Sequence, residues 1–153
     1  MLDIMRERID PLRRFSILFE RYQDAIKAGN FHLAHHYWRK LFNKYNCQIS
    51  PTAKLGRNVR FPHPIGIVIG DGAVIDDDCV IYQNVTIGKK NGKYPILQSK
   101  CVLYPNAVVI GGVTLLEGTI VGAGAVVTKS TEVNYEVIAG VPAKPIGGRD
   151  SSL

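Results

Sequence analysis

The chain has 153 residues, of which 46% are hydrophobic and 21% are charged, values typical of one soluble globular domain with its own core. No run of 18 apolar residues occurs, so the sequence predicts no membrane span. The formal net charge of +6 would suit a phosphate-bearing ligand. No basic run is interleaved with aromatic residues, which argues against a nucleic-acid-binding protein.

The first ten residues, MLDIMRERID, mix acidic with basic side chains and contain no apolar stretch. We therefore expect no secretory signal peptide and a cytoplasmic protein. The three cysteines agree with this expectation, because Cys47, Cys79 and Cys101 show no metal-ligand spacing and their odd count suits no disulfide framework. We expect them to be small buried side chains.

Residues 10–45 show the periodicity of two helices, so we expect residues 1–46 to form a helical hairpin. Asp10 and Pro11 are typical of an N-cap and a first helical residue. Gly29 then predicts the end of the first helix and Asn30 the start of the second. The expected apolar faces comprise Leu12, Phe15, Leu18, Phe19, Tyr22 and Ile26 in the first helix, and Phe31, Ala34, Trp38, Leu41, Phe42 and Tyr45 in the second.

From Ile49 onward the sequence repeats every six residues, a signature of a solenoid. The units are ISPTAK, LGRNVR, FPHPIGIV, IGDGAV, IDDDCV and IYQNVT, and after a break LQSKCV, LYPNAV, VIGGVT, LLEGTI, VGAGAV and the weaker VTKSTE and VNYEVI. The first position is aliphatic or Phe and the fifth is small or β-branched. In a triangular solenoid the first position fills the interior, the fifth lies where space is tight, and Gly or Asp at the second eases the turn. Residues 47–153 are therefore predicted to form a mainly β structure, a β-helix with a C-terminal tail.

Four segments resemble the left-handed parallel β-helix acyltransferases, and in particular the bacterial serine acetyltransferases. They are HPIGIVIGDGAVI (63–75), IYQNVTIG (81–88), VIGGVTLLEGTIVGAGAVV (109–127) and AGVPAKPI (139–146). The left-handed coil is implied by this resemblance alone. The resemblance also implies acetyl-CoA as co-substrate, transfer of acetyl to a hydroxyl, and a cyclic homotrimer with sites at the subunit interfaces.

His63 stands in the only unit with a two-residue insertion and is flanked by two prolines. A lone histidine is usually structural, but the resemblance places His63 on the catalytic histidine of the family. An imidazole, with a pKa of about 6.5, suits a general base at physiological pH. His32, His35 and His36 lie in the second helix, and we expect them on its polar face.

A second irregularity, GKKNGKYPI at residues 88–96, replaces a regular unit. Taken alone it is typical of a mobile surface loop. The resemblance instead implies that it reaches over the active site, where its lysines could meet coenzyme A phosphates. The site residues that it implies are Gly88, Lys89 and Ala123 along the pantetheine arm, Lys144 near a phosphate, and Lys93, Tyr94 and Asp71 near the acceptor.

The sequence departs from serine acetyltransferases where an amino-acid acceptor would bind. Pro62 replaces the aspartate before the catalytic histidine, Tyr94 replaces a second histidine, and the helical domain is short. Asp71 is either a substitute partner for an ammonium group or a turn residue. A sugar of a surface polysaccharide and L-serine both remain possible acceptors.

Two other protein classes compete with the acetyltransferase. A zinc carbonic anhydrase on this scaffold needs three histidines, and the repeat contains His63 alone, so we expect no metal. A non-catalytic trimeric scaffold would need neither the insertion at His63 nor the excursion at residues 88–96.

Overall fold

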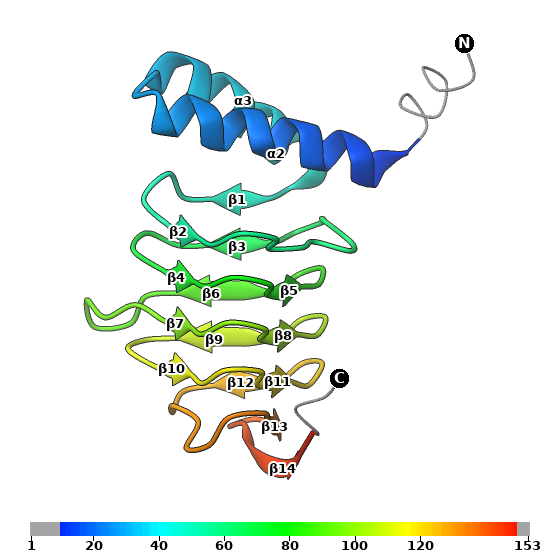
Figure 1. Ribbon diagram of the computed structural model, residues 1–153, viewed down its shortest axis with the longest axis vertical. Coiled ribbons are helices and arrows are strands. Elements are labelled where there is room, and N and C mark those ends of the chain that lie inside the picture. The colour runs from blue at the N-terminus through cyan, green and yellow to red at the C-terminus, as the bar shows by residue number, and fades with distance from the viewer. Residues whose placement is uncertain (1–9, 150–153) are drawn as a thin grey trace.

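A computed structural model describes residues 10–149, in which a helical hairpin lies across one end of a β-helix (Figure 1). The predicted absence of a signal peptide concerns residues that lie mostly outside this range. The helices are α2 (Pro11–Lys27) and α3 (Phe31–Tyr45). The strands are β1 (Gln48–Ile49), β2 (Lys54–Leu55), β3 (Val68–Ile69), β4 (Val74–Ile75), β5 (Val80–Ile81), β6 (Thr86–Gly88), β7 (Ile96–Leu97), β8 (Val102–Leu103), β9 (Val108–Ile110), β10 (Thr114–Leu115), β11 (Ile120–Val121), β12 (Val126–Val127), β13 (Glu136–Ala139) and β14 (Lys144–Gly148).

The helix boundaries follow the predicted capping residues. Asp10 Oδ1 accepts a hydrogen bond from the backbone N–H of Leu12 at 2.9 Å, as an N-cap should. Gly29 has φ of +67° just after α2, and the Asn30 side chain accepts from the N–H of Leu33 at 3.1 Å. Both helix starts and the stop between them are therefore confirmed.

The buried face of the hairpin is narrower than the sequence predicted. It consists of Phe15, Phe19, Tyr22 and Ala25 in α2 and Ala34, Leu41 and Tyr45 in α3. Leu12 is 43% exposed and Phe31 is 74% exposed, so their assignment to the core was wrong. Both lie in the first turn of their helices, beyond the surface that the other helix and the first coil cover.

The hairpin closes the open end of the first coil. The Phe61 ring lies 5.5 Å from the Phe15 ring and 5.2 Å from the Phe19 ring, in edge-to-face contact. The Tyr22 hydroxyl donates a 2.8 Å hydrogen bond to the buried Ile49 carbonyl, and burial raises the Tyr22 pKa to about 12. These contacts cover strand edges that would otherwise be exposed to pairing with other chains.

The β-helix has three parallel faces, which we call sheets A, B and C. Sheet A holds β1, β3, β6, β9 and β12, sheet B holds β2, β4, β7 and β10, and sheet C holds β5, β8, β11 and β13, with β14 antiparallel to β13. First-position residues stack in register from coil to coil, as in Ile69 with Ile87 and Ile87 with Val109. Ile69, Ile87 and Val109 are at most 1% exposed, which confirms the hexapeptide interior.

Two details of the repeat were predicted wrongly. The left-handed backbone conformation falls mainly at the fourth position of the unit, as at Asn84 (φ +57°) and Asn106 (φ +62°), and not at the second. Asn is favoured there because it tolerates this conformation better than most residues. The last unit, VNYEVI, is also out of register, because Val133 is 58% exposed and Ile138 takes the interior place beside Val121.

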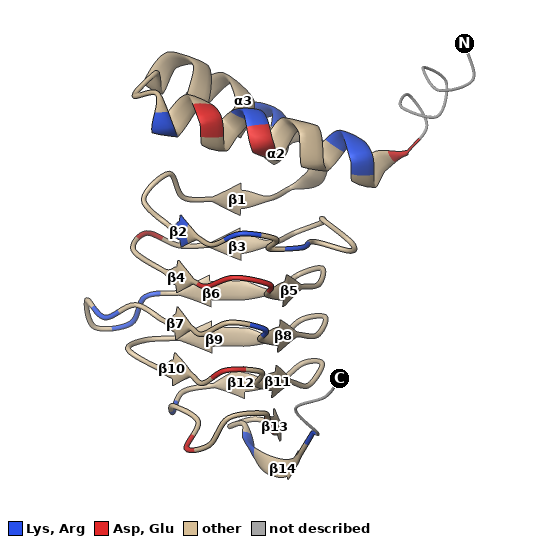
Figure 2. Ribbon diagram, viewed as in Figure 1, with Lys and Arg blue, Asp and Glu red and all other residues tan. Residues whose placement is uncertain are grey.

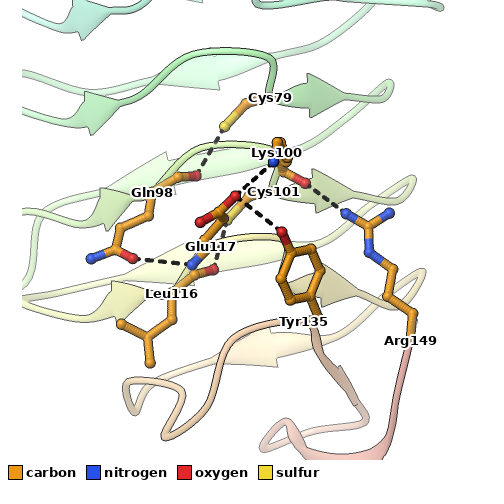
Figure 3. A network of polar contacts seen from close by, with 8 residues as sticks. All are labelled: Cys79, Gln98, Lys100, Cys101, Leu116, Glu117, Tyr135 and Arg149. Carbon is orange, nitrogen blue, oxygen red and sulfur yellow. Dashed lines mark hydrogen bonds and ion pairs between the residues drawn. The ribbon is translucent and has the colours of Figure 1, made fainter. Parts of the chain in front are cut away.

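The C-terminal strand is fastened to the coils by a polar network (Figure 3). Glu117 Oε1 accepts hydrogen bonds from Lys100 Nζ at 2.7 Å and from the Tyr135 hydroxyl at 3.0 Å. Arg149, at the end of β14, donates to the Lys100 carbonyl at 3.2 Å and lies over the Tyr135 ring. The network therefore ties the last coil to the two before it.

Candidate active site

His63 lies at a corner of the first coil, where the chain passes from sheet C to sheet A. The insertion lengthens this corner, and its backbone is held by hydrogen bonds from the Gly66 N–H to Tyr45 and from the Asn84 N–H to Ile65. The His63 side chain is exposed. Its ring lies 6.0 Å from the ring of Tyr82, the corresponding corner residue of the next coil, at an interplanar angle of 45°. The imidazole makes no hydrogen bond with another residue of the described range.

The excursion at residues 88–96 is a tight hairpin at a different corner, between sheets A and B. Lys90 and Lys93 exchange backbone hydrogen bonds of 3.0 and 3.1 Å. Asn91 and Gly92 between them have φ of +53° and +73°. Asn-Gly with two positive φ values is the signature of a type I′ turn, which explains why the hairpin forms locally.

This hairpin lies against the corners of the coils on either side. The Tyr94 ring covers Gly72, where an added Cβ would lie 3.1 Å from the ring, and Lys93 covers Gly112 in the same way. Asp71, beside Gly72, accepts a hydrogen bond from the hydroxyl of Ser50. The structure thus brings Asp71, Lys93 and Tyr94 to one place, which we call the loop corner.

A hollow of about 230 Å³ opens between the hairpin and the next coil. Its wall includes Lys90 and Lys93 on the hairpin and Gly111, Gly112 and Thr128 below it. Two ammonium groups beside glycine backbone form a surface suited to an anion. Figure 2 shows blue segments on the hairpin between β6 and β7, which projects on the left of the view.

The predicted site residues lie at separate corners of one chain. Gly88 and Lys89 lie at the loop corner, whereas Ala123 lies at the same corner type as His63, and the exposed Lys144 lies in β14. The distance between the two corners follows from the next coil, where Asn84 lies at the same type of corner as His63 and Lys89 lies at the loop corner. The four residues of sheet A between them, at about 3.3 Å each, span roughly 13 Å. His63 and the loop corner of one chain are therefore too far apart to hold one acetyl group between them.

Sequence reasoning overlooked Tyr82 and Tyr104. Each directly follows a strand of sheet C, and their rings stack at 5.2 Å with an interplanar angle of 11°. The available signal was their shared second position in IYQNVT and LYPNAV, units that follow each other by one coil.

A separate cleft lies between the helical hairpin and the first coil, and its lining reaches Pro62, the residue before His63. It occupies about 700 Å³, and Phe15, Phe19, Phe61 and Arg57 line it. The Arg57 guanidinium pairs with Asp77 at 2.6 Å, and hydrogen bonds from the Arg57 backbone N–H and then from its side chain lower the pKa of that carboxyl.

The cysteines behave as small core residues, as predicted. Cys47, Cys79 and Cys101 are buried and free, and burial raises the pKa of the Cys47 thiol. Over residues 10–149, no three His, Cys, Asp or Glu side chains gather closely enough to hold a metal ion. Neither helix in the same range is long and apolar enough to cross a membrane.

Comparison with known proteins was made at the level of families, single proteins and solved structures. No family model matches the sequence. The serine acetyltransferase of Synechococcus elongatus is 37% identical over 103 residues, which cover 65% of this chain and 42% of the relative. The crystal structure of serine acetyltransferase from Vibrio cholerae superposes with a TM-score of 0.82 and 27% identity, covering 92% of this chain and 55% of that one. A serine acetyltransferase solved in complex with CoA gives a TM-score of 0.76 and 26% identity, covering 84% and 55% of the two chains.

The fold and the repeat define the class first: the chain is a parallel β-helix built from hexapeptide repeats. It is similar to serine acetyltransferases in sequence and in fold, which confirms the predicted resemblance. The chain spans about half the length of these relatives or less.

Proposed function

We propose that the protein is an acetyl-CoA-dependent O-acetyltransferase in which His63 is the general base. The observation that carries the proposal is the exposed imidazole at the one lengthened corner of sheets C and A, on a scaffold similar to enzymes that transfer acetyl groups. One serine acetyltransferase of this fold was solved with CoA, which supports CoA thioester as the co-substrate.

The reaction is a direct transfer. His63 accepts the proton of the acceptor hydroxyl while the hydroxyl oxygen forms a bond to the acetyl carbonyl carbon. The tetrahedral intermediate then collapses, the carbon–sulfur bond breaks, and the imidazolium returns its proton to the departing thiolate. A neutral imidazole suits both steps near neutral pH.

A homotrimer would complete the site. His63 lies where the chain enters the strands of sheet A, and the loop corner lies where the chain leaves them. One chain therefore supplies only one wall at each place. A cyclic assembly would set the His63 corner of one protomer against the loop corner of the next. Asp71, Lys93 and Tyr94 of the neighbour would then face the acceptor.

The co-substrate would lie along the same seam. We assign Gly88, Lys89 and Ala123 to the pantetheine arm. Gly88 has no side chain and Ala123 a small one, so a ligand can approach their backbone, and the side chain of Lys89 is exposed. Phosphate charges would be met by Lys144 and by the hollow between Lys90 and Lys93. A cytoplasmic location remains our prediction, and it agrees with the supply of acetyl-CoA.

The test is thiol release from acetyl-CoA by the purified protein with L-serine and a panel of sugars. We expect His63→Ala to lower turnover by about 10²-fold or more. His32→Ala, on the exposed face of α3, is the matched control and should leave turnover unchanged. Equal turnover in His63→Ala and wild type would remove His63 from the mechanism. No acetyl-CoA binding and no turnover with any acceptor would instead favour the trimeric scaffold.

A further inference from the structure

The His63 corner runs down the β-helix as a column without any charge. We define this column as residues 62–66, 82–84, 104–106 and 122–124, the successive links from sheet C to sheet A. None of these residues is Asp, Glu, Lys or Arg, and the adjoining sheet A strands of the same coils carry none either. In Figure 2 the small loops that follow β5, β8 and β11 on the right of the view are uniformly tan. The other two corners carry Asp71, Lys89 and Lys93, or Asp77 and Lys100.

Aromatic rings occupy the part of this column nearest His63. Tyr82 lies between the His63 ring at 6.0 Å and the Tyr104 ring at 5.2 Å. The series ends in the next coil, where Gly122 follows the sheet C strand and offers no side chain. Tyr104 is 41% exposed and Tyr82 is half-buried, so both present ring surface to the outside.

The polar groups of the column are neutral and partly unused. Neither tyrosine hydroxyl forms a hydrogen bond with another residue in the range 10–149. The Asn84 amide donates to Asn106 at 3.1 Å, which leaves further amide hydrogens and oxygens of this pair open to solvent. The surface beside the proposed base thus offers apolar rings together with neutral hydrogen-bonding groups.

This surface has the chemistry of a carbohydrate site. A sugar ring has an apolar face of C–H groups, which packs on aromatic rings, and hydroxyls that pair with neutral donors and acceptors. L-serine carries an ammonium and a carboxylate, which when desolvated require charged partners. The column itself provides none. In the proposed trimer the charged groups, Asp71 and Lys93, belong to the opposite wall formed by the neighbour's loop corner, and Asp71 Oδ1 there accepts a hydrogen bond from the hydroxyl of Ser50.

We propose that Tyr82 and Tyr104 are the acceptor-binding wall beside His63, and that they select a neutral carbohydrate hydroxyl over L-serine. The inference rests on the proposed acetyl transfer, because it assigns the acceptor of that same site. If the two stacked rings were only structural, their removal would change only the stability of the protein. If they bind the acceptor, their removal changes the kinetics with that substrate.

The experiment measures KM for the acceptor and for acetyl-CoA separately, by thiol release, in the full chain. The probes are N-acetyl-D-glucosamine, D-galactose and L-serine. We expect turnover with a sugar, and an increase in its KM of about fivefold to tenfold in Tyr82→Ala and in Tyr104→Ala. The KM for acetyl-CoA should change by less than about twofold. The phenylalanine variants keep the ring and should retain most of the affinity.

Controls separate this inference from the function on which it rests. Tyr37→Ala removes a ring that is half-buried, like that of Tyr82, but lies in α3 outside the column, and it should leave both KM values unchanged. If Tyr82→Ala fails to fold, Tyr82→Leu keeps an apolar side chain at the corner and tests the same ring. If L-serine is the preferred acceptor and its KM is unchanged in both tyrosine variants, the inference is overturned, whereas the proposed acetyl transfer is not. A change confined to the KM for acetyl-CoA would assign the rings to the co-substrate and equally overturn it. No thiol release with any acceptor would reject both.

Discussion

Replacing Gly72 with alanine tests whether the excursion at residues 88–96 is held by contact of Tyr94 with the preceding coil. Gly72 has φ of +68°, and a Cβ there would lie 3.1 Å from three atoms of the Tyr94 ring. Gly29 has nearly the same φ, +67°, with nothing within 4 Å of its Cβ position. Gly29→Ala therefore isolates the backbone strain, which should lower the free energy of unfolding by about 1 kcal/mol.

Gly72→Ala adds the displacement of the tyrosine ring to that strain. Overpacking of this kind costs about 1–3 kcal/mol, so we expect a total loss of about 2–4 kcal/mol in urea unfolding monitored by circular dichroism. A double-mutant cycle removes the ambiguity: in a Tyr94→Ala background the same substitution should cost only about 1 kcal/mol. An equal loss in both backgrounds would show that Tyr94 does not rest on Gly72, and the described loop corner would be wrong.

Three further substitutions test the fold. Leu103→Ala empties a fully buried interior position and should cost about 3–5 kcal/mol in urea unfolding, and a loss below about 1 kcal/mol would contradict its place inside the coil. Tyr22→Phe removes the 2.8 Å hydrogen bond to the Ile49 carbonyl and should lower the free energy of unfolding by about 1–2 kcal/mol, whereas no change would mean that the bond is absent in solution. The hydrogen bond from Lys100 lowers the pKa of Glu117, so the stability from this pair is present above the ordinary carboxyl value of 4.5 and is lost as pH falls through the lowered value. Thermal unfolding of Glu117→Gln should accordingly vary less between about pH 5 and pH 3 than that of the wild type, and identical profiles would contradict the pairing.

Local signals in the sequence predicted the fold well, because each has a direct physical cause. Asp10, Gly29 and Asn30 mark helix ends through their own hydrogen bonds and backbone preferences. The six-residue period reports the interior positions, since each coil repeats the same packing constraint. Phe31 and Val133 were misplaced because their exposure depends on how far the hairpin and the last coil extend, which no local pattern encodes.

The candidate site was less predictable, since it depends on which corners coincide in space. His63 and Lys93 both occur at irregular units, and sequence alone suggested one site. The sheet order shows that the two irregularities lie at opposite ends of the sheet A strands. Tyr82 and Tyr104 are 22 residues apart, and only the coil register makes them neighbours in a stack.

The same register explains how a protein can share the scaffold of serine acetyltransferases and still use another acceptor. The first and fifth positions of each unit must fill the interior, so they preserve the family pattern whatever the substrate is. Second positions face outward at the corners, where Tyr82, Tyr104 and Gly122 differ widely in size without disturbing that interior. General-base chemistry needs only one side chain at such a corner, whereas recognition of the acceptor needs the whole column beside it. Under the proposed function, retention of His63 would preserve the reaction, and a change in the neighbouring second positions would be sufficient to change the acceptor.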